Sequence, residues 1–342
     1  MHTATLQSAP ASGGGRTVVT CAPTRVDLGG GWTDVPPYSN ECGGAVCNFA
    51  INRLATVTVR SRTAPSRPDT GNVVRSGNPE THDPLTTAAI RDAGMDPDEV
   101  QVSVANDFPV GAGLGGSSAA GVALAGALAA WRGALPPSVE LARRSRQTEV
   151  NGLGIAGGWQ DHYAAANGGA QLLEFASDDR VNASPLRLTE ETARALERRC
   201  VIAYTGEARV SATTITGVMD AYRAGVPSVV RALSRMGMLA REMAGALTAG
   251  DLDGLAELVA EHWAYQRSLH PAIPTDAIDA LLAAARGAGG LGGKALGASG
   301  GGCVLVMAAD DSVDAVRQAV GARATLIPFG MDMNGFQVVS RG

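Results

Sequence analysis

The segment most suited to chemistry is a glycine-rich turn, PVGAGLGGSSAA, at residues 109–120. A predicted strand leads into it, and Ser117 is expected to cap an Ala-rich helix that follows. Free N–H groups at a helix start attract anions, and glycines let those amides approach a phosphate closely. No lysine follows the last glycine, so this is not a Walker A loop, and the spacing differs from the Rossmann fingerprint. The turn predicts a phosphate site of another kind, the alternative being an ordinary strand-to-helix turn.

Three further segments are rich in glycine: APTRVDLGGGWTD at 22–34, GGWQDHY at 157–163 and GASGGGC at 297–303. The first two also carry charged residues. The carboxylate of Asp161 is of a type that accepts or orients a hydroxyl proton, and Arg25 carries a fixed positive charge. Glu149 lies on a predicted helix just before the second segment. Each has a structural alternative: Arg25 as a surface cation, Asp161 as a helix N-cap and Glu149 on a solvated helix face.

The surrounding elements are predicted from hydrophobic periodicity and turn residues. Strands are expected at 17–22, 44–51, 54–60, 100–104, 200–204 and 303–308, with a return to strand after 325. Helices are expected at 84–93, 117–132, 138–149, 160–166, 227–249, 251–268, 275–288 and 312–320. Ser138 is expected to cap the helix at 138–149. Residues 23–34 are predicted to be turn-rich. Because helices and strands do not alternate strictly, a mixed α+β fold is favoured over a doubly wound sheet.

Composition limits the class of protein. The 342 residues, 45% hydrophobic and 18% charged, exclude global disorder and suggest two domains or one large one. We predict a flexible leader at 1–15, an N-terminal domain at 16–195 and a C-terminal domain at 196–342. The net charge of −5 gives no reason to expect nucleic acid or an anionic membrane as partner, and the longest apolar stretch, 119–131, is too short to cross a bilayer.

The cysteines and the N-terminus bear on the compartment. Five cysteines, an odd number without zinc-ligand spacing, favour reduced thiols in the cytoplasm over a disulfide framework. The first residues lack the basic and apolar regions of a signal peptide. The sequence makes no prediction about the oligomeric state.

These motifs resemble those of the GHMP kinase superfamily, which includes galactokinase, homoserine kinase and mevalonate kinase. The turn at 109–120 is similar to the family's phosphate loop, 22–34 to its N-terminal sugar motif and 297–303 to its C-terminal glycine motif. GGWTDVPPYS and GGWQDHYAAANGG resemble two branches, the D-glycero-D-manno-heptose 7-phosphate kinases and the fucokinase domain. YTGEARVSA and EHWAYQRSL are similar to the former, and the tryptophan of GGWTD is nearer the latter. The resemblance implies a two-lobed α+β fold with the active site in the cleft between the lobes.

The implied activity is transfer of the ATP γ-phosphoryl group to the anomeric hydroxyl of a sugar or sugar phosphate, with Mg²⁺. A heptose 7-phosphate, yielding the 1,7-bisphosphate, is the first expectation. L-Fucose or a related free sugar is the alternative, and a sensor that binds sugar and ATP without turnover is a third. The expected partner is thus a small-molecule substrate.

The resemblance also implies residue roles. The residues expected at the ATP phosphates are Pro109, Gly111, Gly113, Leu114, Gly115, Gly116, Ser117 and Ser118. Ser118 and Glu149 are expected to hold Mg²⁺, and Asp161 and Arg25 to be catalytic.

The residues expected at the sugar are Trp32, Thr33, Asp34, Gly158, Gly300 and Gly301. Arg209 and Arg267 are candidates for the phosphate of a sugar phosphate, because arginine binds phosphate bidentately; both are equally explained as surface residues. Lys294 precedes the last glycine motif and is a weaker candidate for phosphate charge. His162, His262 and His270 are too scattered for a metal site and are interpreted as structural.

Overall fold

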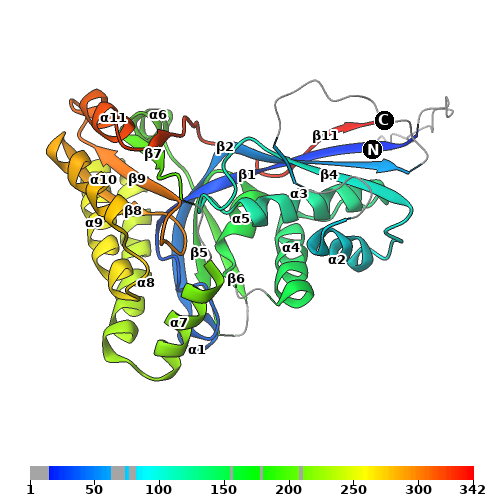
Figure 1. Ribbon diagram of the computed structural model, residues 1–342, viewed down its shortest axis with the longest axis horizontal. Coiled ribbons are helices and arrows are strands. Elements are labelled where there is room, and N and C mark those ends of the chain that lie inside the picture. Colours follow the sequence, from blue (N-terminus) through cyan, green and yellow to red (C-terminus); the bar gives the residue numbers. More distant parts are fainter. Residues whose placement is uncertain (1–14, 63–73, 77–81, 155–156, 178–179, 208–210) are drawn as a thin grey trace, which may run out of the picture.

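The computed structural model describes residues 15–62, 74–76, 82–154, 157–177, 180–207 and 211–342. Figure 1 shows two lobes, each an antiparallel sheet with helices packed against it, and a pair of long strands that runs from one lobe toward the other. The mixed α+β class and the two-lobed arrangement predicted from the sequence are confirmed.

The first sheet has the order β11-β1-β2-β4-β3, and β5 and β6 continue it from the other half of β2. Its described strands are β1 (Thr17–Gly29), β2 (Gly44–Ser61), β3 (Val74–Ser76), β4 (Val100–Asn106), β5 (Ala170–Phe175), β6 (Val181–Leu186) and β11 (Gln337–Arg341). The helices of this half are α1 (Tyr38–Cys42), α2 (Pro84–Asp92), α3 (Gly116–Trp131), α4 (Ser138–Leu153) and α5 (Gln160–Asn167).

The second sheet has the order β10-β7-β9-β8. Its strands are β7 (Cys200–Tyr204), β8 (Gly290–Ala295), β9 (Cys303–Ala308) and β10 (Thr325–Leu326). The helices of this half are α6 (Glu190–Arg199), α7 (Ser211–Arg223), α8 (Pro227–Ala249), α9 (Leu252–Ser268), α10 (Asp276–Gly287) and α11 (Val313–Gly321).

The helix α3 forms the centre of the first half. Its sequence is apolar on nearly every side, and a helix of that kind must be buried all round. It packs on β1 and β2 and against α4 and α5, with Leu124 and Leu128 at most 2% exposed. The N-terminal end of α3 is thereby fixed at the end of the sheet where the glycine-rich turn lies.

The largest local difference from the sequence prediction concerns 23–34. The strand β1 continues to Gly29 rather than ending at Ala22. Polar residues in this segment led to the prediction of a turn. In the structure those side chains, including Arg25 and Asp27, are buried and bonded inside the protein, so the strand can continue. The expected break between 51 and 54 is also wrong: β2 is continuous, and the register shift lies opposite, between Pro23 and Thr24.

Several elements were not predicted, namely α1, β3, β5, β6, α6, α7 and β8. The expected caps at Ser117 and Ser138 are wrong as well, because both residues lie inside their helices and the N-caps are Gly115 and Pro137. The last strand, β11, returns to the first half and pairs with β1. The division of the chain at 195/196 therefore stays a proposal, since the final strand is shared with the first sheet.

Candidate active site

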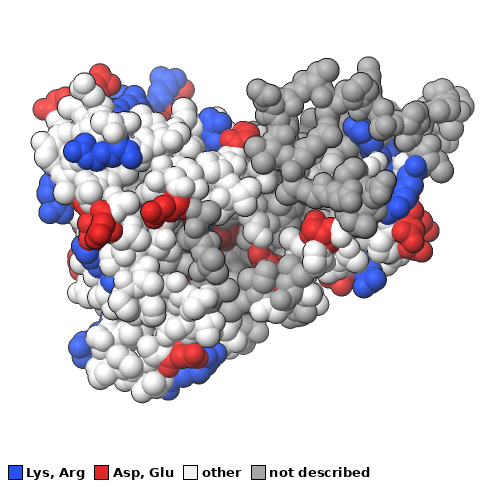
Figure 2. Space-filling view, viewed as in Figure 1, with Lys and Arg blue, Asp and Glu red and all other residues white. Residues whose placement is uncertain are grey.

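A cavity of about 540 Å³ lies at the junction of the glycine-rich turn, the end of β1 and the start of α5. The predicted site residues that line it are Arg25, Trp32, Asp34, Pro109, Gly111, Gly113, Leu114, Gly115, Gly116, Ser117, Ser118, Glu149, Gly158 and Asp161. Most of the predicted set is thus brought together from four separate segments. Figure 2 shows acidic side chains in the hollow between the two halves, and Asp27 and Asp83 join the carboxylates along the cavity wall.

The glycine-rich turn presents the N-terminus of α3 to this cavity. Gly115 is the N-cap, with φ 76°, and within the described parts of the chain no side chain caps this end of the helix. The first amides of the helix are therefore available for an anion. A Cβ at Gly115 would lie 3.0 Å from the Asp161 carboxyl carbon, so glycine lets the turn approach that side chain. The geometry fits the phosphates of a nucleotide.

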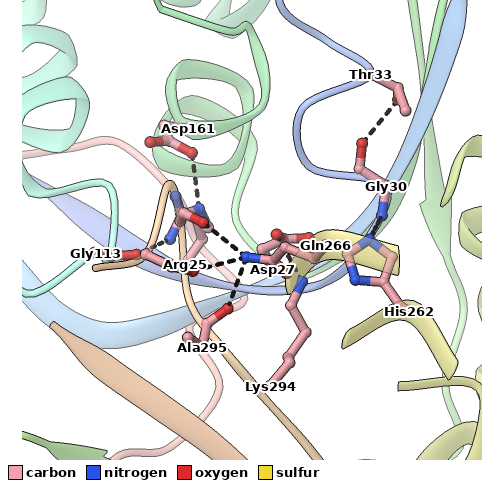
Figure 3. Close-up of polar contacts among 12 residues, drawn as sticks. Arg25, Asp27, Gly30, Thr33, Gly113, Asp161, His262, Gln266, Lys294 and Ala295 are labelled. Atoms are coloured by element: carbon pink, nitrogen blue, oxygen red, sulfur yellow. Dashed lines mark hydrogen bonds and ion pairs between the residues drawn. The ribbon is translucent and has the colours of Figure 1, made fainter. Parts of the chain in front are cut away.

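Arg25 and Asp161 form an ion pair beside the turn (Figure 3). The Nε of Arg25 donates to Oδ1 of Asp161 at 2.7 Å, and its Nη1 donates to the Gly113 carbonyl at 2.6 Å. The backbone N–H of Arg25 also donates to the Leu114 carbonyl at 3.0 Å. Arg25 is 3% exposed and Asp161 is 26% exposed. The arginine thus fixes the turn while the carboxylate still faces the cavity.

Glu149 meets the first serines of α3 on the other side of the turn. Its carboxylate accepts from Ser117 Oγ at 2.8 Å and Ser118 Oγ at 3.3 Å, and His162 Nε2 lies 3.1 Å away. Burial opposes ionisation of Glu149, but the hydrogen bonds and charge of His162 and the two serine hydroxyls bring its pKa below the usual range. A hydroxyl and an ionised carboxylate are oxygen donors that suit Mg²⁺, which keeps several waters. Ser118 and Glu149 therefore fit the predicted metal role.

His162 was interpreted from the sequence as structural, and its place beside this pair was missed. Its Nδ1 lies 2.9 Å from Ser145 Oγ, so both ring nitrogens are engaged. It orients Glu149 in the way that outer residues orient metal ligands. The sequence did offer a signal for this role of His162. The residue directly follows Asp161 on a helix whose start faces the glycine-rich turn.

Asp34 occupies the end of the cavity away from the serines. Its Oδ2 accepts the N–H groups of Trp159 at 2.9 Å and Gln160 at 3.1 Å, at the N-terminus of α5. Burial, and to a smaller extent the charges of Asp161 and Asp27, raise its pKa to about 6. Gly158 allows this approach, because a Cβ there would lie 1.9 Å from Asp34 Oδ2. One carboxylate oxygen is held by the backbone, and the side chain lines the cavity.

The three glycines before Trp32 let the backbone pack closely against neighbouring groups. Gly30 has φ 88° and lies against the Ala45 carbonyl, and a Cβ at Gly31 would lie 2.4 Å from Asp27 Oδ2. Trp32 follows with φ 85°, an unusual conformation for a residue with a side chain. Thr33 does not line the cavity: it is fully buried and its hydroxyl donates to the Gly30 carbonyl at 2.8 Å. Its placement is that of a residue which fixes the turn.

The glycine motif at 297–303 packs on the glycine-rich turn. The Cys303 N–H donates to the Ala112 carbonyl at 2.7 Å. Gly302, with φ 81°, would place a Cβ 2.8 Å from that carbonyl oxygen. Gly297 lines the cavity, whereas Gly300 and Gly301 lie beyond its described wall and shape the turn.

Three predicted cations are not placed at the cavity by the structure. Arg209 lies outside the described residues. Arg267 lines a separate pocket, where it donates to Asp279 at 2.8 Å and lies over Trp263. On α9 it is Gln266 that faces inward, and the next residue is rotated by about 100°. Lys294 is fully buried and pairs with Asp27 at 2.9 Å, so its charge is already engaged.

Sequence reasoning also missed the apolar wall beyond the phosphate turn. Leu85, Val104 and Phe108 line the cavity there. These residues read only as parts of a helix, a strand and a loop, and only the fold brings them together.

No helix among the described parts of the chain is long and apolar enough to span a membrane.

Comparison with known families decides the class of protein. The N-terminal domain model of the GHMP kinases matches residues 85–169, and their C-terminal model matches 243–325. The first match contains the phosphate turn and Asp161, and the second contains the glycine motif. The chain belongs to the GHMP kinase family. GHMP kinases are phosphotransferases, and the GHMP relatives of this chain include sugar kinases.

Two relatives illustrate the range of sugars in this family. The D-glycero-alpha-D-manno-heptose 7-phosphate kinase of Campylobacter jejuni is 27% identical over 84% of this chain and 88% of its own length. The bifunctional fucokinase/GDP-fucose pyrophosphorylase of Arabidopsis thaliana is 26% identical over 84% of this chain. The chain spans 29% of that longer protein.

Solved structures of GHMP kinases have the same fold. A D-glycero-D-manno-heptose 1-phosphate kinase from Bacteroides thetaiotaomicron is 25% identical, with a TM-score of 0.74 over 94% of this chain and 99% of that one. The galactokinase of Lactococcus lactis, in complex with galactose, is 18% identical with a TM-score of 0.69 over 94% of this chain and 95% of that one. The second likeness bears on the fold alone.

Proposed function

We propose that this GHMP kinase transfers the γ-phosphoryl group of ATP to the anomeric hydroxyl of a sugar, with a heptose 7-phosphate as the first substrate and its 1,7-bisphosphate as the product. The observation that carries the proposal is the Arg25–Asp161 pair, set 2.7 Å apart between the phosphate turn and Asp34. Phosphoryl transfer requires phosphates held in place, charge neutralised and a positioned hydroxyl, and the cavity offers residues for each.

The chain's own residues divide the work. The amides of 113–118 hold the ATP phosphates at the start of α3. Ser118 and Glu149 hold Mg²⁺, which neutralises phosphate charge when bound. Asp161 accepts the hydrogen bond of the attacking hydroxyl and receives or directs its proton. Arg25 stabilises the charge of the transferring group and keeps Asp161 in place.

The sugar is recognised at the other end of the cavity. Asp34, held on one oxygen by α5, accepts hydrogen bonds from sugar hydroxyls. Trp32 offers an apolar face to the C–H side of the ring, and Gly158 admits the sugar close to Asp34. The heptose 7-phosphate is favoured by the likeness to the Campylobacter enzyme over most of both chains. A reduced cytoplasm, where ATP is abundant, suits this reaction, and no disulfide links the described cysteines.

A free sugar such as L-fucose is the second candidate, and one observation favours it. Among the described residues that line the cavity, Arg25 is the only arginine or lysine. Its Nε and Nη1 already bond to Asp161 and Gly113. The phosphate group of a sugar phosphate needs a cation of its own, which the described wall of the cavity does not offer, whereas a neutral sugar needs none.

A panel of sugars with Mg-ATP tests the proposal. We expect ADP release with D-glycero-D-manno-heptose 7-phosphate, and a new anomeric phosphate in the ³¹P spectrum of the product. Turnover of L-fucose in place of the heptose phosphate would select the second candidate. No ADP release with any sugar would contradict the kinase assignment and leave a sugar sensor.

A further inference from the structure

The only lysine of the chain is buried beneath the sugar end of the site. Lys294 lies on β8 in the second sheet, is 0% exposed and donates from Nζ to Asp27 Oδ2 at 2.9 Å. Asp27 lies on β1 in the first sheet, two residues after Arg25, and lines the cavity. The pair therefore joins β8 of the second sheet directly to β1 of the first, and Figure 3 shows the two side chains meeting.

A second contact from the same half meets the same turn. His262 on α9 accepts the Gly30 N–H on Nε2 at 2.9 Å. Burial and the charge of Lys294 hold its pKa well below the usual range, so the ring is neutral, as this bond requires. Lys294 thus bonds to Asp27, and His262 bonds to Gly30. Both contacts lie just before Trp32 and Asp34 in the sequence.

A buried ion pair is poor evidence for stability, because removing two charges from water costs about as much as their attraction returns. A purely structural link at this point would be served as well by apolar side chains. What an ion pair adds is a fixed geometry and a local charge balance. Here the balance matters, because the uncompensated charge of Asp27 would act on Asp34.

We propose that Lys294 is a positioning residue for phosphoryl transfer: through Asp27 it sets the place of the 27–34 segment against Asp161, and it cancels a carboxylate charge beneath the sugar. The inference rests on the proposed sugar-kinase function. The close packing of Gly31 against Asp27 transmits the position, since a Cβ there would lie 2.4 Å from the carboxylate. Asp27 Oδ1 is buried without a partner in the structure, so Lys294 supplies the main bond that Asp27 makes.

The charged and titratable groups that face this pair can be named in full for the described residues. Asp27 faces Lys294 from β8, His262 from α9, Arg25 from β1 and Cys47 from β2. Asp34 faces Asp161 from α5 and Asp27 from β1. Burial is the largest cause of the raised pKa of Asp34, and the Asp27 charge adds to it. Loss of the Lys294 charge would therefore favour protonation at the sugar end.

Three variants test the proposal, with the wild-type enzyme and the sugar that it phosphorylates as reference. Lys294→Met leaves Asp27 uncompensated, and we expect kcat/KM for the sugar to fall by about 100-fold with KM for ATP little changed. The acid limb of its pH profile should move to higher pH. The double variant Asp27→Asn/Lys294→Met removes both charges and should fold even where Lys294→Met does not.

In the double variant we expect the acid limb to return to its wild-type position. The kcat/KM for the sugar should stay at least roughly 10-fold low, because the link is absent. Arg241→Met is the matched control: Arg241 on α8 also pairs at 2.9 Å with a residue of the first sheet, Glu174, but at the surface. Its kinetics should be those of the wild type.

Several results would overturn the inference. Wild-type sugar kinetics in the double variant would remove the positioning role. Equal rises in KM for ATP and sugar, or an unmoved acid limb in a folded Lys294→Met enzyme, would show that the Lys294–Asp27 pair only stabilises the fold. Each of these is read against a wild-type enzyme that turns over, whereas a wild type without turnover contradicts the proposed function itself.

Discussion

At the scale of residues, the site is made of buried polar side chains that bond to one another. Arg25 is almost fully buried yet has two partners, Asp161 and the Gly113 carbonyl. Burying an ionised group is costly unless it is paired, so each partner holds the other in place. The carboxylate that faces the cavity is the one with remaining exposure, Asp161. This division gives one fixed charge and one group that can meet a substrate.

Replacement of Asp161 tests that division. In Asp161→Asn the amide oxygen still accepts from Arg25, so the turn should stay in place. The loss of the carboxylate should lower kcat by roughly 10²–10⁴-fold, with KM for ATP unchanged. Steady-state kinetics measure both. Turnover within a few-fold of the wild type would remove Asp161 from the mechanism.

Asp34 predicts opposite effects on activity and stability. Its pKa of about 6 in the folded protein lies above the ordinary 3.8, so the native state binds the proton more tightly than the unfolded chain. Its ionisation therefore costs stability as pH rises from about 4 to about 6, and the cost remains above that range. In the proposed mechanism the ionised form binds the sugar hydroxyls, so kcat/KM for the sugar should fall below about pH 6.

The variant Asp34→Asn separates these effects. At about pH 7.5 we expect it to be more stable than the wild type by roughly 1–3 kcal/mol, since its amide oxygen still accepts from Trp159 and Gln160. The gain should disappear near pH 4, while the kcat/KM for the sugar is lost at every pH. Thermal melts at the two pH values check the first part. A variant less stable than the wild type at about pH 7.5 would mean that Asp34 is not held against its ionisation.

At the scale of elements, the proposed nucleotide site depends on two glycine-rich loops that touch. The motif at 297–303 lies against the turn at 109–116, and its Cys303 N–H bonds the Ala112 carbonyl. The contact has no room for a side chain at Gly302. The loop from the second half thereby sets the position of amides that belong to the first.

Gly302→Ala should therefore act on ATP. The added Cβ would lie 2.8 Å from the Ala112 carbonyl oxygen in a backbone conformation that favours glycine. We expect KM for ATP to rise about 10-fold or more, because small displacements of a positioning group are costly. The matched control is Gly245→Ala on α8, where nothing lies within 4 Å; it should keep its kinetics. Equal KM values for ATP in both variants would exclude the role of Gly302.

Elements with a clear local pattern were predictable, and those set by the tertiary structure were not. The helices α2, α8, α9 and α10 follow from their periodicity, and most of the cavity wall follows from motifs. The continuation of β1 through Arg25 and Asp27 could not be read, because buried partners far along the chain satisfy those side chains. For α6 the signals were present: Thr189 caps it, with acidic residues first and basic residues last.

At the scale of the whole molecule, the two halves share one interior. A single apolar cluster contains Val26 and Leu128 from the first half together with Leu239, Val259 and Leu305 from the second. The strand β11 returns to pair with β1, and in Figure 1 it carries the C-terminus back to the first sheet. The cavity lies where these halves meet, so its residues are held from both sides.

The measurement that tests the central claim most directly is a crystal structure with Mg²⁺, a non-hydrolysable ATP analogue and the sugar. We predict the triphosphate on the amides of 113–118, the metal on Ser118 and Glu149, and the anomeric hydroxyl between Asp161 and the γ-phosphate. A triphosphate bound elsewhere, with the turn at 111–118 engaged only by protein atoms, would contradict the account.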